Sequence, residues 1–333
     1  MQLVSSTGTN FKHLAAQFLK QQHYVAQMMN HIYDVNGKKQ SLDKLLNGKD
    51  SETKWFPALS NEWGRLAQGN DSGVESTNTI EFISYSEVPA DRKVTYVSFV
   101  CDHRPLKDEQ WRIRLVVGGD KLEYEFDSGS PTTDLTETKV LINSVISDAK
   151  DGARFLSMDL KDMFLHTPME RPEYMKVPLK YFPPDIITKY ALHKLVHRGY
   201  IYIKIIKGMY GLKQAAVLAY NNLSKLLEAA GYQPIINSLG MWKHASRKTL
   251  FCLCVDDFGV KYYSKDDMTH LLQAIGKQYT CKVDWTGKNF LGLKLNWNYD
   301  QQYVDISMPN YIEKTLQRLQ YTQQVHPQYS PHH

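Results

Sequence analysis

Two adjacent carboxylates, Asp256 and Asp257, stand in the middle of the apolar stretch LFCLCVDDFGVKYY. Adjacent carboxylates at the turn of an apolar hairpin repel each other and resist removal from water. A bound divalent cation relieves both costs, whereas an exposed turn keeps both charges hydrated. The residues alone therefore leave two interpretations open, a metal site and an exposed turn.

A third candidate carboxylate, Asp159, also follows an apolar strand pattern in RFLSMDLKDMFLH, and Asp162 lies three residues further on. Mg²⁺ prefers oxygen ligands and typically takes one or two carboxylates together with substrate phosphates. Two such ions about 3.5 to 4 Å apart can activate an attacking hydroxyl and stabilise a leaving pyrophosphate. That chemistry requires carboxylates from two strand ends that meet in space. The alternative for Asp159 is a strand-end cap or an exposed turn residue.

The second Asp-Asp doublet, Asp266-Asp267, has a structural explanation. It follows Ser264 and precedes the helical pattern MTHLLQAI. Acidic residues in a first helical turn complement the helix dipole, and Ser264 or an Asp can supply the cap. We assign this doublet no chemistry.

The elements that must position these carboxylates mix extended and helical patterns. Strands are expected in TIEFISY, KVTYVSFVC, WRIRLVVGG, RFLSM, IYIKIIK, LFCLC, FGVKYY, FLGLKLNW and QYVDISM. Helices are expected over about 10–34, 135–149 with Asp134 as cap, 211–231, 266–278 and YIEKTLQRLQ. The polar, lysine-rich segment from Val35 to Lys54 is interpreted as a connector. No regular βαβ order appears, which predicts an α+β fold.

The composition is that of an ordinary globular protein, with 333 residues, of which 42% are hydrophobic and 23% charged. No stretch approaches the roughly 18 apolar residues that cross a bilayer, and the start does not resemble a secretory signal. The net charge of +5 permits nucleic-acid binding without requiring it. The cysteines lack CxxC spacing, which predicts neither a zinc site nor a disulfide framework and favours an intracellular protein. They are Cys101, Cys252, Cys254 and Cys281.

Five motifs, in order, resemble those of copia-type reverse transcriptases of LTR-retrotransposon polyproteins. They are RIRLVVGGDKLEY in the fingers, MDLKDMFLHTPMERPEYMKVP in the palm, KGMYGLKQA, the Asp-Asp box CVDDF and the primer grip NFLGLKL. Their order and spacing match from about Trp63 to Met308. The resemblance implies a right-hand polymerase with fingers, an antiparallel palm sheet and a partial thumb.

The resemblance implies that Asp159, Asp256 and Asp257 bind two Mg²⁺ ions, for which Mn²⁺ can substitute. The backbone carbonyl of Leu160 would be a further metal ligand. The segment Leu291-Gly292 would position the primer end.

The resemblance also implies a set of nucleotide contacts. Arg114 would pair with triphosphate oxygens, and Lys121 is a second candidate for the same task. Asp162 would lie near the triphosphate, and Gln214 would contact the nucleotide or the template base. The ring of Phe164 would occupy the space of a ribose 2′-hydroxyl and so select deoxynucleotides.

Each of these positions also has an ordinary explanation. Phe164 fits a core residue, Gln214 a surface residue of a first helical turn, and Gly211 and Gly292 fit turns. One of Arg112 and Arg114 fits a solvated edge charge. Three further aromatic residues could stack on nucleic acid, although their patterns favour core packing; these are Trp285, Trp297 and Tyr299.

Several positions depart from the family pattern. Cys254 replaces the usual tyrosine before the doublet, and Phe258 follows it where methionine or isoleucine is common. Asp162 stands where threonine is frequent. Gly118-Gly119-Asp120 replaces Ala-Lys-Gly. None of these changes removes a predicted metal ligand.

These observations predict three regions: 1–60, a helical or linker segment after the integrase; 61–310, fingers and palm; and 311–333, the start of the thumb or connection. The fingers are expected from about Glu81 to Ala149. The sequence shows no set of spaced carboxylates typical of ribonuclease H, no His-His-Cys-Cys zinc motif and no Asp-Thr/Ser-Gly protease motif. We therefore expect an excised or truncated polyprotein segment.

The expected reaction is attack of a primer 3′-hydroxyl on the α-phosphate of a deoxynucleotide, on an RNA or DNA template. The implied partners are template-primer, dNTPs and other polyprotein segments such as integrase and ribonuclease H, with no membrane. The implied location is cytoplasmic, in virus-like particles, or nuclear with the integration complex. Two alternatives stay open: another palm-type nucleotidyltransferase such as an RNA-dependent RNA polymerase, and a catalytically silent or domesticated fragment that binds nucleic acid or a polyprotein partner.

Overall fold

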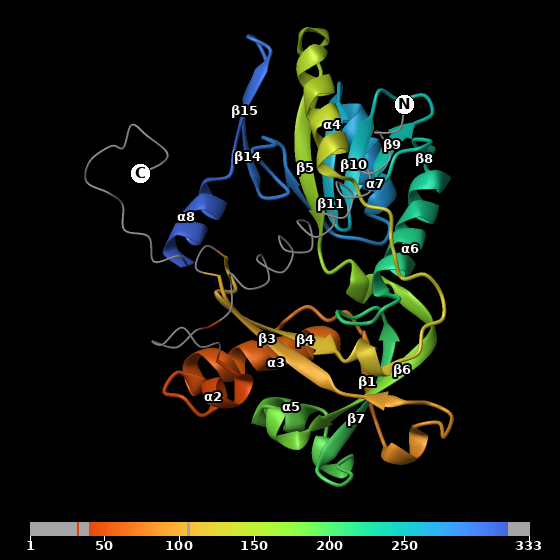
Figure 1. Ribbon diagram of the computed structural model, residues 1–333. Coiled ribbons are helices and arrows are strands. Elements are labelled where there is room, and N and C mark those ends of the chain that lie inside the picture. Colours follow the sequence, from red (N-terminus) through yellow and green to blue (C-terminus); the bar gives the residue numbers. More distant parts are fainter. Residues whose placement is uncertain (1–31, 33–39, 105–106, 319–333) are drawn as a thin grey trace, which may run out of the picture. The chain divides into compact units, whose positions relative to one another are not determined.

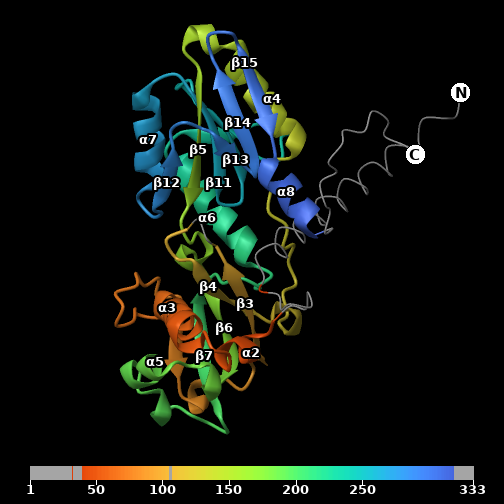
Figure 2. The same ribbon diagram turned by 90° about the vertical axis from the view of Figure 1, so that its left-hand side faces the viewer.

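The computed structural model describes residue 32 and residues 40–104 and 107–318. The chain divides into two compact units that alternate along the sequence (Figures 1 and 2). The first unit ends at Ser128 and resumes over Phe164–Ala219, and the second contains Gly129–Met163 and the chain from Tyr220. Except for Ile32, the predicted helix over 10–34 lies outside the described residues.

The first unit is built on a four-stranded sheet in the order β1-β7-β6-β2 and a separate β3–β4 hairpin. Its pairs are antiparallel except β2–β6. In β7, Ile201, Ile203 and Ile205 are fully buried while Lys204 is partly exposed, which is the period-two pattern of a sheet with one face on a core. The strands are β1 (Ile80–Ile83), β2 (Val94–Thr95), β3 (Val97–His103), β4 (Trp111–Val117), β6 (Pro168–Pro178) and β7 (Tyr200–Lys207).

Helices near residues 42–66 complete the core of the first unit. The connector predicted from Val35 to Lys54 is wrong within its described part, because Leu42 and Leu45 are buried in the same core as Leu59 and Trp63. In α2 the apolar residues Leu42 and Leu45 carry this packing, and the intervening Asp43 and Lys44 are exposed. The helices of this unit are α2 (Leu42–Leu46), the π-helix η1 (Ser51–Trp55), α3 (Phe56–Leu66) and α5 (Pro184–Lys189). Its short 3₁₀ turns are η2 (Tyr85–Glu87), η3 (Gly119–Lys121), η5 (Phe164–His166), η6 (Leu179–Tyr181) and η7 (Leu192–Lys194).

The second unit is built on a six-stranded sheet in the order β12-β5-β11-β10-β9-β8. Every neighbouring pair in it is antiparallel, so the predicted α+β fold with an antiparallel central sheet is confirmed. A smaller sheet, β13-β14-β15, belongs to the same unit. The strands are β5 (Arg154–Leu160), β8 (Tyr232–Pro234), β9 (Met241–His244), β10 (Leu250–Cys254), β11 (Asp257–Tyr262), β12 (Cys281–Asp284), β13 (Asn289–Phe290), β14 (Leu293–Asn298) and β15 (Tyr303–Ser307).

The helix α4 (Leu135–Ser147) covers one face of this sheet, where its residues Leu141 and Val145 pack with Phe155 of β5. As predicted, Asp134 caps α4, and its carboxylate accepts the Glu137 N–H at 2.7 Å. The structure therefore groups α4 with the carboxylate-bearing strands, although the fingers were predicted to extend to Ala149.

The remaining helices begin close to their predicted starts, with one exception. The predicted helix over 211–231 begins only at Ala215, because Gly211 has φ +95°. Ser264 caps α7 and accepts the Asp267 N–H at 3.1 Å, so that Ser264 is the cap and the doublet lies in the first helical turn, as predicted. No helix within the described ranges is long and apolar enough to cross a membrane. The helices are η4 (Ala149–Asp151), α6 (Ala215–Ala229), α7 (Lys265–Ile275) and α8 (Pro309–Arg318), and the unit division falls within α6.

Candidate active site

The three predicted metal-binding carboxylates lie together in the second unit, at one end of the β5–β11 pair. Asp159 is directly opposite Asp257 in the antiparallel register, where Cβ atoms are roughly 4.5 to 5.5 Å apart. Asp256 stands beside them in the two-residue turn between β10 and β11, and its carbonyl accepts the Leu160 N–H at 2.9 Å. The fold thus brings carboxylates from two distant chain segments to one place.

This arrangement concentrates negative charge in a half-buried setting. Burial, followed by the charges of Asp256 and Asp159, raises the pKa of Asp257 to about 7. Burial and then Asp159 raise the pKa of Asp256 to about 6. Burial, followed by the charges of Asp257 and Asp256, raises the pKa of the Cys254 thiol to about 11. The ionised carboxylates are therefore costly without a counter-charge, which is the situation that a cation relieves.

The turn that presents Asp256 is strained. Val255 has φ +61°, a region in which a β-branched residue is a genuine outlier. Two-residue hairpin turns with positive φ at the first position normally carry glycine, asparagine or aspartate there. The β10–β11 ladder holds the turn on both sides, from the pair Leu250–Lys261 to the pair Cys254–Asp257. A strained backbone conformation of this kind persists only where the surrounding structure holds it in place, and such conformations cluster at functional sites.

The predicted primer-grip hairpin, β13–β14, packs on the carboxylate side of the sheet. Alternate residues share a face, so Ser157 and Gly259 lie on the face of Asp159 and Asp257. The Ser157 hydroxyl donates to the Asn289 carbonyl at 2.7 Å. A Cβ on Gly259 would lie 2.8 Å from the Phe290 ring, so a glycine is needed there.

The turn of that hairpin is formed by the two predicted primer-grip residues. Leu291 has φ +48° and Gly292 has φ +79°, the combination of a type I′ turn. Leu291 is half-buried against the core beside Phe290, whereas Gly292 is exposed. The hairpin therefore exposes the backbone of Gly292, while Phe290 and Leu291 hold it against the core.

The donor set fits a hard divalent cation, because it consists of carboxylate oxygens on neighbouring positions. In residues 40–104 and 107–318, no group of three or more His, Cys, Asp or Glu side chains forms a ready-made metal cluster. Mg²⁺ often binds through one or two carboxylates and completes its shell with water and substrate phosphates. The pair Asp159 and Asp257, with Asp256 from the turn, matches that mode. The Leu160 N–H already donates to the Asp256 carbonyl, and the Leu160 carbonyl is the atom that was predicted to bind metal.

Two further predicted residues lie on either side of the point after β5 at which the chain passes from the second unit to the first. Asp162 is half-buried in the second unit and has φ +52°, a conformation that Asp tolerates. Phe164 belongs to the first unit and is partly buried against its core. Its ring meets Tyr210 edge-on, with the centroids 5.6 Å apart. Phe164 therefore has a packing role, and its predicted role as a gate is compatible with its exposed part.

Tyr210 connects two predicted nucleotide-binding residues of the first unit. It contacts Phe164 through its ring, and the Arg114 guanidinium lies 5.9 Å from the centroid of the same ring. The Tyr210 carbonyl also accepts the Val117 N–H at 2.7 Å. Sequence reasoning did not single out Tyr210, although it lies inside the motif KGMYGLKQA.

Two glycines, Gly119 and Gly211, allow the backbone near Val117 to approach the backbone near Tyr210. A Cβ on Gly119 would lie 2.1 Å from the Gly211 carbonyl oxygen, and a Cβ on Gly211 would lie 2.1 Å from the Val117 carbonyl oxygen. The backbone after β4 therefore packs directly on the backbone of the KGMYGLKQA turn. Gly211 is more than an ordinary turn residue, because this close approach requires it.

Arg114 is held by a carboxylate. Its guanidinium lies 2.6 Å from Asp102, and its side chain is 37% exposed whereas that of Asp102 is 1% exposed. Arg112 lies 3.7 Å from Glu109 with its side chain 16% exposed, so the expectation that one of the two arginines is a solvated edge charge is wrong. Lys121 is the freer cation, since its side chain is 67% exposed and 3.8 Å from Asp120.

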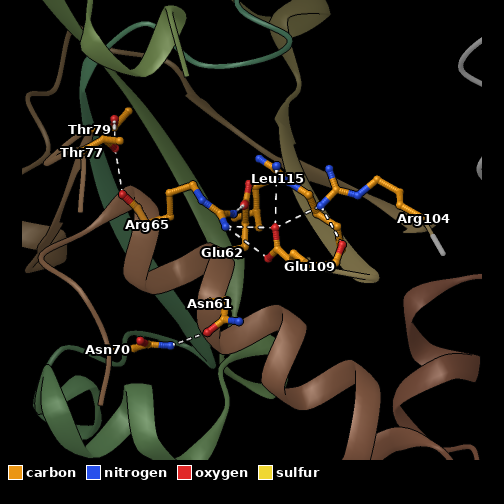
Figure 3. A network of polar contacts seen from close by, with 10 residues as sticks. Asn61, Glu62, Arg65, Asn70, Thr77, Thr79, Arg104, Glu109 and Leu115 are labelled. Atoms are coloured by element: carbon orange, nitrogen blue, oxygen red, sulfur yellow. Dashed lines mark hydrogen bonds and ion pairs between the residues drawn. The ribbon is translucent and has the colours of Figure 1, made fainter. Parts of the chain in front are cut away.

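A buried ionic network anchors the strand that carries Arg114 (Figure 3). Glu62 of α3 is 1% exposed, accepts the Leu115 N–H at 3.3 Å and pairs with Arg65 at 2.5 Å. Arg65 in turn binds Glu109 at 3.1 Å, and Glu109 binds Arg104. Burial raises the pKa of Glu62, and Arg65 opposes that shift. Sequence reasoning missed this network, whose only local signal is the Glu62–Arg65 spacing.

Gln214 is buried, so the alternative of a surface residue is wrong. Its amide donates to Glu173 at 3.3 Å, and Glu173 pairs with Arg92 at 2.8 Å. Gln214 precedes α6 and lines a cavity of about 440 Å³ within the first unit. Arg92, Glu173, Tyr124, Phe126 and Leu218 also line this cavity. Its position is compatible with a nucleotide or template contact through this cavity.

The three additional aromatic residues differ in their surroundings. Trp297 stacks with Tyr299 at 5.5 Å, and its Nε1 donates to the Gly287 carbonyl at 2.9 Å, so core packing is confirmed for this pair. Trp285 is 46% exposed, so core packing is wrong there.

Comparisons with known proteins agree with the motifs. Residues 81–332 match the family described as reverse transcriptase (RNA-dependent DNA polymerase). No curated protein matches the chain. One similar solved structure is that of apo telomerase from Candida Tropicalis truncated from the C-terminal domain, with 13% identity and a TM-score of 0.38. The match covers 76% of this chain and 60% of that chain.

Proposed function

Because the chain belongs to the copia-type reverse transcriptase (RNA-dependent DNA polymerase) family, we propose that it extends a primer 3′-hydroxyl by two-metal nucleotidyl transfer. The observation that carries this proposal is the direct pairing of Asp159 with Asp257 beside Asp256. Asp159 and Asp257 lie on the face to which the Ser157 hydroxyl fastens the β13–β14 hairpin. We further propose that the chain is the polymerase segment of a retrotransposon polyprotein, working with integrase and ribonuclease H segments in cytoplasmic particles.

In the proposed reaction, the primer O3′ forms a bond to the α-phosphorus of a dNTP, and the bond from that phosphorus to pyrophosphate breaks. Two Mg²⁺ ions bound at Asp159, Asp256 and Asp257 would lower the pKa of the attacking hydroxyl and stabilise the leaving pyrophosphate. The hydrogen bond from Leu160 to the Asp256 carbonyl keeps the turn in place while the charge on the site changes. The strained Val255 turn and the ladder around it keep the carboxylates pre-organised.

The remaining residues would bind and select the substrates. Arg114 would contact triphosphate oxygens, with Asp102 fixing the orientation of its guanidinium. Lys121 supplies a second, exposed cation. Phe164, supported by Tyr210, would exclude a 2′-hydroxyl from the sugar position. The Leu291-Gly292 turn would contact the primer end, and Gln214 the templating pair.

The test is primer extension on poly(rA)/oligo(dT) with dTTP and Mg²⁺. The double variant Asp256→Asn/Asp257→Asn should lose extension. The matched control is Asp266→Asn/Asp267→Asn, which makes the same chemical change at a doublet that lies in the first turn of α7 and pairs with Arg247. Extension should survive in the control.

Two outcomes would contradict the proposal. Extension that persists in Asp256→Asn/Asp257→Asn would remove the carboxylates from the chemistry. A folded wild type that binds template-primer without extending it would favour the alternative of a catalytically silent nucleic-acid-binding protein.

A further inference from the structure

The outer face of the four-stranded sheet in the first unit carries a second apolar cluster. Ile83, Tyr174 and Tyr202 are buried there, away from the main core. In the sheet register, Ile83 of β1 and Lys176 of β6 are both direct partners of Tyr202 on β7. This cluster forms the base on which a group of more exposed rings rests.

The exposed rings form a platform at this end of the sheet. Tyr85 is 49% exposed and stacks on His197, with a centroid distance of 4.2 Å and an interplanar angle of 12°. Tyr85 also contacts Tyr202, with the centroids 5.0 Å apart. The Lys176 ammonium lies 4.9 Å above the Tyr200 ring. The stacked Tyr85–His197 pair and the Tyr200 ring, which has a cation above it, therefore provide two neighbouring aromatic surfaces.

A turn adds an arginine to the edge of these rings. His197 and Tyr200 bond each other through both backbone groups, at 2.9 and 3.0 Å, so that Arg198 and Gly199 form a two-residue turn. Arg198 has φ +51° and Gly199 has φ +81°. Type I′ turns of this kind strongly prefer Asn-Gly, and an arginine in the left-handed region is unfavourable. Burial raises the pKa of Tyr202, and Arg198 lowers it, which indicates that the arginine charge is near the ring.

The first-unit segment that carries His197, Arg198 and Tyr200 is basic. It contains no Asp or Glu from Ile186 to Ala219, and its cations are Lys189, Lys194, Arg198, Lys204, Lys207 and Lys213. Of these, Lys189 pairs with Asp71 at 3.3 Å. Two neighbouring acids on other segments are engaged within the unit. Glu81 pairs with Lys204 at 3.0 Å, and Glu87 accepts the Ser84 N–H at 2.7 Å.

We propose that this aromatic–basic patch, defined as Tyr85, Lys176, His197, Arg198 and Tyr200, binds single-stranded nucleic acid. A base stacks on the Tyr85–His197 platform, and Lys176 and Arg198 contact phosphates on either side. Stacking rings interleaved with cations are the common means of holding single strands without reading their sequence. An acidic peptide would satisfy the cations but would leave the flat ring surfaces without matching partners. The inference goes beyond the proposed function, because binding at the patch does not require the carboxylates.

The experiment measures binding of a short fluorescein-labelled oligo(dT) to the full chain by anisotropy, with a salt titration. Arg198→Asn is the decisive variant, because asparagine favours the left-handed turn position while the charge is removed. It should melt at the same or a higher temperature, bind more weakly, and reduce the salt slope by about 0.7. Tyr85→Leu should weaken binding at least about fivefold, whereas Tyr85→Phe should bind like wild type. Lys150→Gln, at an exposed cation of the second unit, is the matched control.

The same measurements in an Asp256→Asn/Asp257→Asn background separate this inference from the proposed function. Patch-dependent binding should persist there even though extension is lost. An oligo(dT) carrying 5-iodouracil should also cross-link to Tyr85 or His197. Unchanged affinity and salt slope in folded Tyr85→Leu and Arg198→Asn would overturn the proposal and leave the patch to a protein partner.

Discussion

Asp159 and Asp257 face each other directly across the β5–β11 ladder, at positions where like charges destabilise a sheet. The third carboxylate, Asp256, follows a residue in a strained conformation. These features oppose stability in the absence of a cation. They are therefore a physical indication that the site is maintained for binding and chemistry.

The first prediction concerns the conflict between stability and activity at this pair. Asp257→Asn removes one of two facing charges, so the metal-free protein should gain up to about 1 kcal/mol in its free energy of unfolding above pH 7. Extension should fall by at least about a hundredfold. Urea unfolding in EDTA and primer extension measure the two effects. A variant that is less stable than wild type in EDTA would argue against repulsion between the pair.

The second prediction concerns pH. The pKa of Asp257 is raised to about 7 and that of Asp256 to about 6, above the ordinary value near 4 of an unfolded chain. The folded protein therefore binds more protons than the unfolded one between about pH 4 and 7, and its metal-free stability falls as pH rises through that window.

The measurement is urea unfolding at several pH values in EDTA and in Mg²⁺. Mg²⁺ should flatten the decline, because it binds the ionised form. Asp256→Asn/Asp257→Asn should flatten it in EDTA as well. A decline of the same size in that double variant would assign the pH dependence to other groups.

The third prediction concerns the strained turn. Val255→Gly removes the cost of a side chain at φ +61° and should raise the free energy of unfolding by about 1 kcal/mol. It should lower extension, because glycine loosens the turn that presents Asp256. Gln302→Gly, at φ +54° near the β14–β15 turn, is the control and should leave extension unchanged. Equal activity of Val255→Gly and wild type would show that the rigidity of the turn is not needed.

The fourth prediction concerns sugar selection. Phe164→Val shortens the ring that is expected to exclude the 2′-hydroxyl, so the ratio of kcat/KM for ribonucleotides to that for deoxynucleotides should rise at least about tenfold. Phe182→Leu, a buried substitution in the same core, should leave the ratio unchanged. A Phe164→Val enzyme that is merely less stable, with the wild-type ratio, would reduce Phe164 to a packing residue.

The fifth prediction concerns the buried network under β4. Glu62→Ala leaves Arg65 without its closest carboxylate and the Leu115 N–H without an acceptor. Loss of one partner of a buried pair costs about 3 kcal/mol or more. The KM for dNTP should rise more than kcat falls, because the strand that carries Arg114 loses its anchor. Steady-state kinetics near the wild-type values would show that β4 is positioned by its other contacts.

The local features of the site could be predicted from the sequence because they depend on short-range physics. Apolar runs that end in Asp159 and Asp256 indicate strands, and the caps at Asp134 and Ser264 follow from hydrogen bonding within one helical turn. The order of the five motifs was enough to expect a polymerase, and the family match agrees with it.

Other features depend on which distant elements meet, and only the tertiary structure decided them. The direct Asp159–Asp257 pairing is a matter of register between strands about a hundred residues apart, which a period-two pattern leaves undetermined. The close contact of Gly119 with Gly211, the position of Tyr210 between Arg114 and Phe164, and the burial of Gln214 have no local signal either. A residue pattern indicates which face of an element is buried, but packing against a particular partner is settled by the folded chain as a whole.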